Sequence, residues 1–117
     1  MQFYCAKCHL PITNEIQKVN GLYVLNEEDK EDYLPRGYFI VSNGEYFTGS
    51  EGKLLINKAD LINCKEHSDS RRLNGCCGLD GMDGINKICV NGHEIGTEKS
   101  DCWHSHAVII ESEAVFS

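Results

Sequence analysis

Seven cysteines are the feature that most constrains this chain of 117 residues. Two form a Cys-x2-Cys pair near the N-terminus and two are adjacent, and the full set is Cys5, Cys8, Cys64, Cys76, Cys77, Cys89 and Cys102. Because seven is odd, a framework made only of disulfides would leave one thiol unpaired. Cysteine is 7 of 117 residues, below the roughly 8–10% typical of short disulfide scaffolds. Thiolates at these spacings favour a soft metal ion, and zinc first.

The compartment bears on this interpretation, because thiols stay reduced in the cytosol. Residues 1–5 lack the basic segment and apolar run of a secretory signal. The chain also has no apolar stretch near the ~20 residues that cross a bilayer. We therefore expect a cytoplasmic protein without a membrane segment, in which the cysteines are metal ligands.

The formal net charge of −7 argues against one class of partner. Binding to nucleic-acid phosphates requires clustered lysine and arginine, and the basic residues here gather only at Lys65 and Arg71–Arg72. We expect no nucleic-acid partner. An acidic surface instead steers basic proteins, so a protein partner is the expectation.

Two tetrahedral zinc ions need eight ligands, which seven cysteines and one histidine would supply, or six cysteines and two histidines if one cysteine is not a ligand. In extended backbone, adjacent side chains point to opposite faces, so Cys76 and Cys77 are expected to serve different ions. Cys64 is left as a small buried hydrophobe, and His104 or His106 remains an alternative donor beside Cys102. The preferred partition is Cys5, Cys8, His67 and Cys76 for one ion, and Cys77, Cys89, His93 and Cys102 for the other.

The pattern of apolar residues predicts a single domain that is α+β or mainly β, with a small antiparallel sheet beside a loop-rich, zinc-stabilised segment. Residues 1–20 read as a zinc knuckle, 21–63 as strands, 64–105 as the cysteine-rich metal segment and 106–117 as a C-terminal strand. Strands are expected at 22–25, 37–42, 45–48, 53–57 and 107–110, with a helical turn at 58–62. Asn43–Gly44 predicts a tight hairpin turn, and the all-apolar residues 107–110 predict a central strand.

A tripeptide pattern of glycine, an apolar residue and Asp or Asn runs through residues 78–86. Glycine allows positive φ, and Asp or Asn hydrogen-bonds within its own turn. We expect successive tight turns with the apolar residues tucked inward. The spacing does not fit the every-second-residue ligands of an EF-hand calcium loop.

The sequence is also compatible with two other chemistries. Cys5-x2-Cys8-His9 matches the c-type haem attachment signature, with His9 and Met82 as axial ligands, but this leaves five cysteines unused. A zinc enzyme would keep an open coordination position beside a base such as Glu94 or Asp101. The chain has no H-E-x-x-H motif, and structural zinc is the preferred interpretation.

The segment Gly75-Cys76-Cys77-Gly78-Leu79-Asp80-Gly81-x-Asp83-Gly84-x-Asn86, followed by Cys89 and Asp101-Cys102-Trp103, resembles a group of small uncharacterised bacterial cysteine-rich proteins. The likeness covers about residues 64–105 and implies metal binding without naming a function. In that group a second cysteine follows the equivalent of Cys89. Asn91-Gly92 stands here instead, which is why His93 is taken as a ligand. We expect a zinc-binding interaction or inhibitor-type module, with a hydrolase-type metalloenzyme as the alternative.

Overall fold

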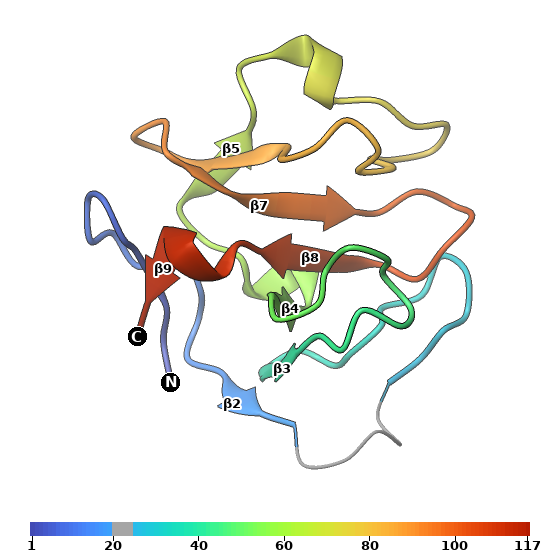
Figure 1. Cartoon of the computed structure of the whole chain (residues 1–117), viewed down its shortest axis with the longest axis horizontal. Helices are drawn as coiled ribbons and strands as arrows, with labels where there is room; N and C mark the ends of the chain where they lie inside the picture. Colours follow the sequence, from blue (N-terminus) through green and yellow to red (C-terminus); the bar gives the residue numbers. More distant parts are fainter. Residues whose placement is uncertain (20–24) are drawn as a thin grey trace.

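The computed structural model describes residues 1–19 and 25–117, and it is mainly β, as expected. A seven-stranded sheet has the order β2-β3-β4-β8-β7-β6-β5, and a two-stranded sheet joins β1 to β9 (Figure 1). The strands are β1 (Tyr4–Cys5), β2 (Gln17–Lys18), β3 (Tyr38–Val41), β4 (Leu54–Ile56), β5 (Cys64–Glu66), β6 (Lys87–Cys89), β7 (Glu94–Lys99), β8 (Ala107–Ile110) and β9 (Val115–Phe116). Short 3-10 turns are η1 (Lys58–Asp60), η2 (Ser70–Arg72) and η3 (Ser112–Ala114).

Strand β8 is central because both of its faces are apolar, as its sequence predicts. It lies between β4 and β7, and all four residues are buried. Val108 and Ile110 join one core cluster, and Ala107 and Ile109 join the other. Side chains of a strand alternate between faces, so the main sheet is covered on both sides.

Strands β3 and β4 and the turn η1 confirm three of the predicted elements. β3 pairs antiparallel with β4, but residues 45–48 do not return as the second strand of a tight hairpin. Phe47 is instead buried, and its ring packs 5.1 Å from the ring of Tyr33. The gain from burying this ring outweighs the local strand tendency, so residues 43–52 form a long connection over one sheet face. The strand predicted at 22–25 falls largely on residues 20–24, outside the described residues.

The cysteine-rich segment is loop-rich, as expected, but it also contributes three strands to the main sheet, which the sequence pattern did not predict. β5 pairs with β6, β6 with β7, and β7 with β8, all antiparallel. The sheet is mixed rather than purely antiparallel, because β2 runs parallel to β3. Ile88 and Ile95 are buried, and they supply the apolar positions that place β6 and β7 on the core.

The tripeptide pattern does form turns, with φ of +70° at Gly81 and +91° at Gly84. Met82 is 70% exposed, so the expectation that the apolar residues tuck inward is wrong at this position. Neighbouring residues form hydrogen bonds with the polar groups of these turns. For example, the Met82 N–H donates to Asp80 Oδ1 at 2.9 Å. Such local hydrogen bonds hold the loop without an apolar core.

The two chain ends lie side by side (Figure 1). Tyr4 pairs with Phe116 and Cys5 with Val115, and the rings of Tyr4 and Phe116 stack at 5.5 Å. This pairing fixes the start of the predicted knuckle against the main body of the molecule. Among the described residues, no helix is long and apolar enough to cross a membrane.

Candidate metal centres

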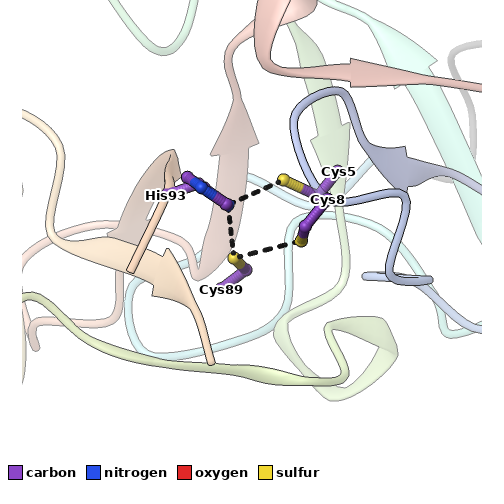
Figure 2. Close-up of side chains that lie close together, drawn as sticks. All are labelled: Cys5, Cys8, Cys89 and His93. Atoms are coloured by element: carbon purple, nitrogen blue, oxygen red, sulfur yellow. Dashed lines mark hydrogen bonds between the residues drawn. The ribbon is translucent and has the colours of Figure 1, made fainter. Parts of the chain in front are cut away.

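Four metal-ligating side chains converge where the N-terminal knuckle meets the β6–β7 hairpin. They are Cys5, Cys8, Cys89 and His93, and Figure 2 shows their side chains pointing toward one another. Their ligand atoms all lie within 4.8 Å of each other. Cys5 is 1% exposed and Cys89 is fully buried, and both belong to the apolar core of one sheet face.

Three of the six distances between these ligand atoms match the edges of a zinc tetrahedron. Cys8 Sγ lies 3.8 Å from Cys89 Sγ, and His93 Nδ1 lies 3.4 Å from Cys89 Sγ and 3.5 Å from Cys5 Sγ. Zinc bonds of about 2.3 Å to sulfur and about 2.0–2.1 Å to nitrogen give tetrahedral edges of about 3.8 Å and 3.5 Å. The residues therefore fit a four-coordinate ion held by three sulfurs and Nδ1 of one histidine.

Tight turns aim each pair of ligands. In the knuckle, His9 N–H donates to Cys5 O at 2.8 Å and His9 has φ of +63°. In the hairpin, Cys89 N–H donates to His93 O at 2.8 Å, and Gly92 has φ of +89°. Glycine adopts this left-handed conformation without steric cost. The hairpin turn thus brings Cys89 and His93, four residues apart, to the same side.

Hydrogen bonding prepares one of the thiols for metal binding. The side-chain amide of Asn91 and the backbone N–H of Leu10 lower the pKa of Cys8 to about 6. Burial raises the pKa of the Cys5 thiol, because a buried charge without a counter-ion is costly. A cation among the sulfurs removes that cost. Metal affinity should therefore fall as the pH drops and protons compete for the thiolates.

A second group of three thiols lies at the other end of β7. Cys76, Cys77 and Cys102 have sulfurs within 4.8 Å of one another, and Cys76 and Cys77 are exposed. Figure 1 shows that the β7–β8 connection lies opposite the β6–β7 turn. Hydrogen bonds to the sulfurs of Cys102 and Cys76 raise the pKa of Cys77 to about 12. Three thiolates at this separation repel one another unless a cation joins them.

Asp101 organises the backbone that carries these three thiols. Its Oδ1 accepts the N–H groups of Cys77 at 2.9 Å and Cys102 at 2.7 Å. Its Oδ2 accepts the N–H of Cys76 at 3.0 Å and Nε1–H of Trp103 at 3.1 Å. These donors, the N–H of Cys77 first, hold the pKa of the Asp101 carboxyl well below its ordinary value. Asp101 is thus a positioning residue and is not placed to act as a general base.

Asp101→Asn is expected to loosen the three-thiol loop, because an amide nitrogen would face two of the four N–H donors. In hydrogen exchange, the amides of Cys76, Cys77 and Cys102 should lose protection. The depressed pKa makes this stabilisation complete above the ordinary aspartate pKa of about 3.9 and lost as the pH falls. The difference from wild type should therefore shrink in acid, and equal protection in both proteins at pH 7 would contradict this role.

The structure groups the predicted ligands differently from the proposed partition. It brings Cys5 and Cys8 to Cys89 and His93, and not to His67 and Cys76. His67 Nε2 instead lies 2.9 Å from Glu94 Oε2, and His67 Nδ1 accepts the N–H of Asp69. Cys76 and Cys77 share one group, which corrects the expectation that they serve different ions.

Three other candidates lie outside both groups. Burial is the main cause that raises the pKa of Cys64 to about 12. This half-buried thiol therefore stays neutral where it packs beside the core. The ring of His9 packs against Phe116 at 5.3 Å. His106 Nδ1 accepts from Lys58 Nζ at 2.6 Å, and its Nε2–H donates to the carbonyl oxygen of Asp101 at 2.9 Å. The haem interpretation of Cys5, Cys8 and His9 gains no support from this arrangement.

The predicted partition already placed Cys89 and His93 at one ion, but with Cys77 and Cys102 rather than with Cys5 and Cys8. Cys89-x3-His93 begins at the end of one strand and ends before the next, with Asn91-Gly92 between them as a turn.

Comparison with known proteins adds no relative: no family model, curated protein or solved structure matches this chain.

Proposed function

We propose that this chain is a zinc-stabilised binding module in which Cys5, Cys8, Cys89 and His93 hold a structural zinc ion. The observation that carries the proposal is the convergence of three sulfurs and one nitrogen within 4.8 Å, with three of their six separations at the values of a zinc tetrahedron. Four protein ligands leave no open coordination position, which is the arrangement of structural rather than catalytic zinc. The ion would join the N-terminal knuckle to the β6–β7 hairpin.

The location of the site supports a structural role. Cys5 and Cys89 lie in the same core cluster as Phe3, Ile12 and Val108. The knuckle lies 81 to 88 residues away from the hairpin along the chain, so closing this loop without a cross-link costs conformational entropy. Zinc binding energy would offset that cost, since a site absent from the unfolded chain couples binding to folding.

The surface beside the ion supports a basic protein partner. A cavity of about 410 Å³ borders the knuckle, and its lining includes Lys7 and the glutamates Glu94, Glu111 and Glu113. With a net charge of −7, this face would attract a positively charged segment. A lysine-rich peptide serves as the probe. Glu113→Lys should weaken binding of this peptide at low salt. If the affinity for the peptide is unchanged, this cavity is not the docking surface.

Native mass spectrometry with elemental analysis of untagged protein tests the zinc assignment. The triple variant C76S/C77S/C102S retains only the four-ligand group and should carry one zinc ion per chain. Adding Cys89→Ser to that variant should remove the ion, whereas adding Cys64→Ser should not. A zinc-free triple variant would overturn the proposal, as would zinc that persists after Cys89→Ser.

The alternative of a metalloenzyme draws on one observation, the incomplete ligand set of the three-thiol group. Among the residues that the structure describes, neither of the two candidate bases is free to activate water at this group. Asp101 already accepts four hydrogen bonds, and Glu94 contacts His67 and Arg72. Three thiolates also donate more charge to a zinc ion than three histidines would, which leaves bound water less acidic. Hydrolysis is therefore the weaker proposal.

A further inference from the structure

The three thiols that the zinc proposal leaves aside have the properties of a separate ligand-binding site. Cys76, Cys77 and Cys102 come from two loops at one end of the sheet, and their sulfurs lie within 4.8 Å of each other. No fourth ligating side chain joins this group among the residues that the structure describes. Unlike the buried first group, it reaches the surface, because Cys76 and Cys77 are exposed.

Interactions other than contacts between the cysteines hold the two loops, so that the three sulfurs lie close together. The buried carboxylate of Asp101 binds the backbone N–H groups of all three cysteines. Close packing also restricts the preceding turn, since a Cβ on Gly75 would lie 1.6 Å from the carbonyl oxygen of Gly78. This second observation shows a preorganised site rather than three exposed thiols that happen to be close.

We infer that Cys76, Cys77 and Cys102 bind a thiophilic divalent ion through three sulfurs and take a thiol from outside the chain as the fourth ligand. Soft sulfur donors without oxygen or nitrogen select ions such as zinc or cadmium. Such ions complete a tetrahedron, so the fourth position faces solvent and holds water at first. An arriving thiol releases its proton to solvent, its sulfur bonds to the ion, and the water leaves. No oxidation or reduction occurs.

One residue of this chain competes for the fourth position. His104 follows Cys102 by two residues, and its Nδ1 donates to Ser105 O at 2.9 Å. Its buried Nε2 has no hydrogen-bond partner within residues 1–19 and 25–117. That tautomer leaves Nε2 able to bind a metal. The nitrogens of His104 are nevertheless not part of the three-sulfur group, and the imidazole lies in a cavity wall with Tyr46 and Trp103. The external thiol is therefore the assigned ligand.

Cadmium is the probe that tests this assignment, because sulfur-to-cadmium charge transfer in the ultraviolet reports each bound thiolate. The full chain loaded with two cadmium ions should show six protein thiolates. Saturating 2-mercaptoethanol should then raise the charge-transfer absorbance by about one sixth, as a seventh thiolate binds. The dissociation constants of 2-mercaptoethanol and of a peptide with one cysteine are then compared. A lower dissociation constant for the peptide indicates a protein thiol as the ligand, and a lower one for 2-mercaptoethanol indicates a small-molecule thiol.

Matched variants separate this inference from the zinc proposal. Cys102→Ser should lose the thiol response and keep the three-thiolate signal of the first group, which also shows that the fold survives. Cys64→Ser and His104→Ala should keep both. The inference fails if only one ion binds to the full chain, if added thiol leaves the absorbance unchanged, or if His104→Ala is needed to open the site to thiol.

Discussion

If the proposed zinc ion holds the knuckle to the hairpin, a zinc chelator should lower the thermal unfolding midpoint of the wild-type protein by at least about 15 °C, since structural zinc contributes on the order of 10 kcal/mol in small domains. Without the ion, the knuckle around Cys5 and Cys8 separates from the hairpin that carries Cys89 and His93. Phe3 and Ile12, which belong to the same core cluster, would lose part of their packing. Scanning calorimetry with and without a zinc chelator measures the effect.

Cys89→Ser is the matched variant for this prediction. Cys89 is fully buried, so the substitution also places a hydroxyl in the core. The diagnostic quantity is therefore the difference made by the chelator, which should disappear in Cys89→Ser and persist in Cys64→Ser. To keep the three-thiol group from contributing, the comparison is made in the C76S/C77S/C102S background. A chelator shift of equal size in both variants would assign the stabilisation to another site.

Gly96→Ala is expected to cost about 3 kcal/mol or more of unfolding free energy, at the upper end for overpacking a core. Gly96 is buried in β7 and pairs with Lys87 of β6 and Ile110 of β8. A Cβ at this position would lie 2.2 Å from the carbonyl oxygen of Ile109. Because that neighbour is backbone of the central strand, β7 must move away from β8. Urea unfolding at fixed zinc concentration measures the loss.

Gly49→Ala provides the control for backbone conformation. Gly49 has φ of +86°, and apart from its chain neighbours no heavy atom of the described part of the chain lies within 4 Å of a Cβ built there. This variant therefore carries only the conformational cost of a left-handed residue, about 1 kcal/mol. Gly96→Ala should also weaken zinc binding, because β7 begins directly after His93. If the unfolding free energy falls by the same amount in Gly96→Ala and Gly49→Ala, the close approach of β7 and β8 does not explain the effect of Gly96→Ala.

The elements that could be predicted from the sequence are those whose core contacts follow from local pattern. β3, β4 and β8 are short apolar runs bounded by turn residues, and each forms close to its predicted range. The segment around Phe47 could not be predicted in this way, because its ring packs against Tyr33 across the fold. β5, β6 and β7 could not be predicted from local pattern, because cysteine and charged residues interrupt their apolar alternation.

The ligand types were easier to predict than their grouping. Cys5-x2-Cys8 is a local pair, and the departure at Asn91-Gly92 indicated His93. Which cysteine pair lies beside His93 depends on pairing between distant strands. β1 pairs with β9, and β6 is part of the main sheet. The separation of Cys76 from Cys77 assumed an extended backbone. Asp101 accepts both of their N–H groups instead, so the two side chains need not alternate.

X-ray absorption at the zinc edge of the zinc-loaded C76S/C77S/C102S variant tests the central claim most directly. The structure predicts one zinc ion with three sulfurs at about 2.3 Å and one nitrogen at about 2.0–2.1 Å. His93→Cys, the matched variant, should convert this shell to four sulfurs. A shell dominated by oxygen or nitrogen, or a sulfur count that stays the same in His93→Cys, would contradict the structural zinc site at the knuckle and hairpin.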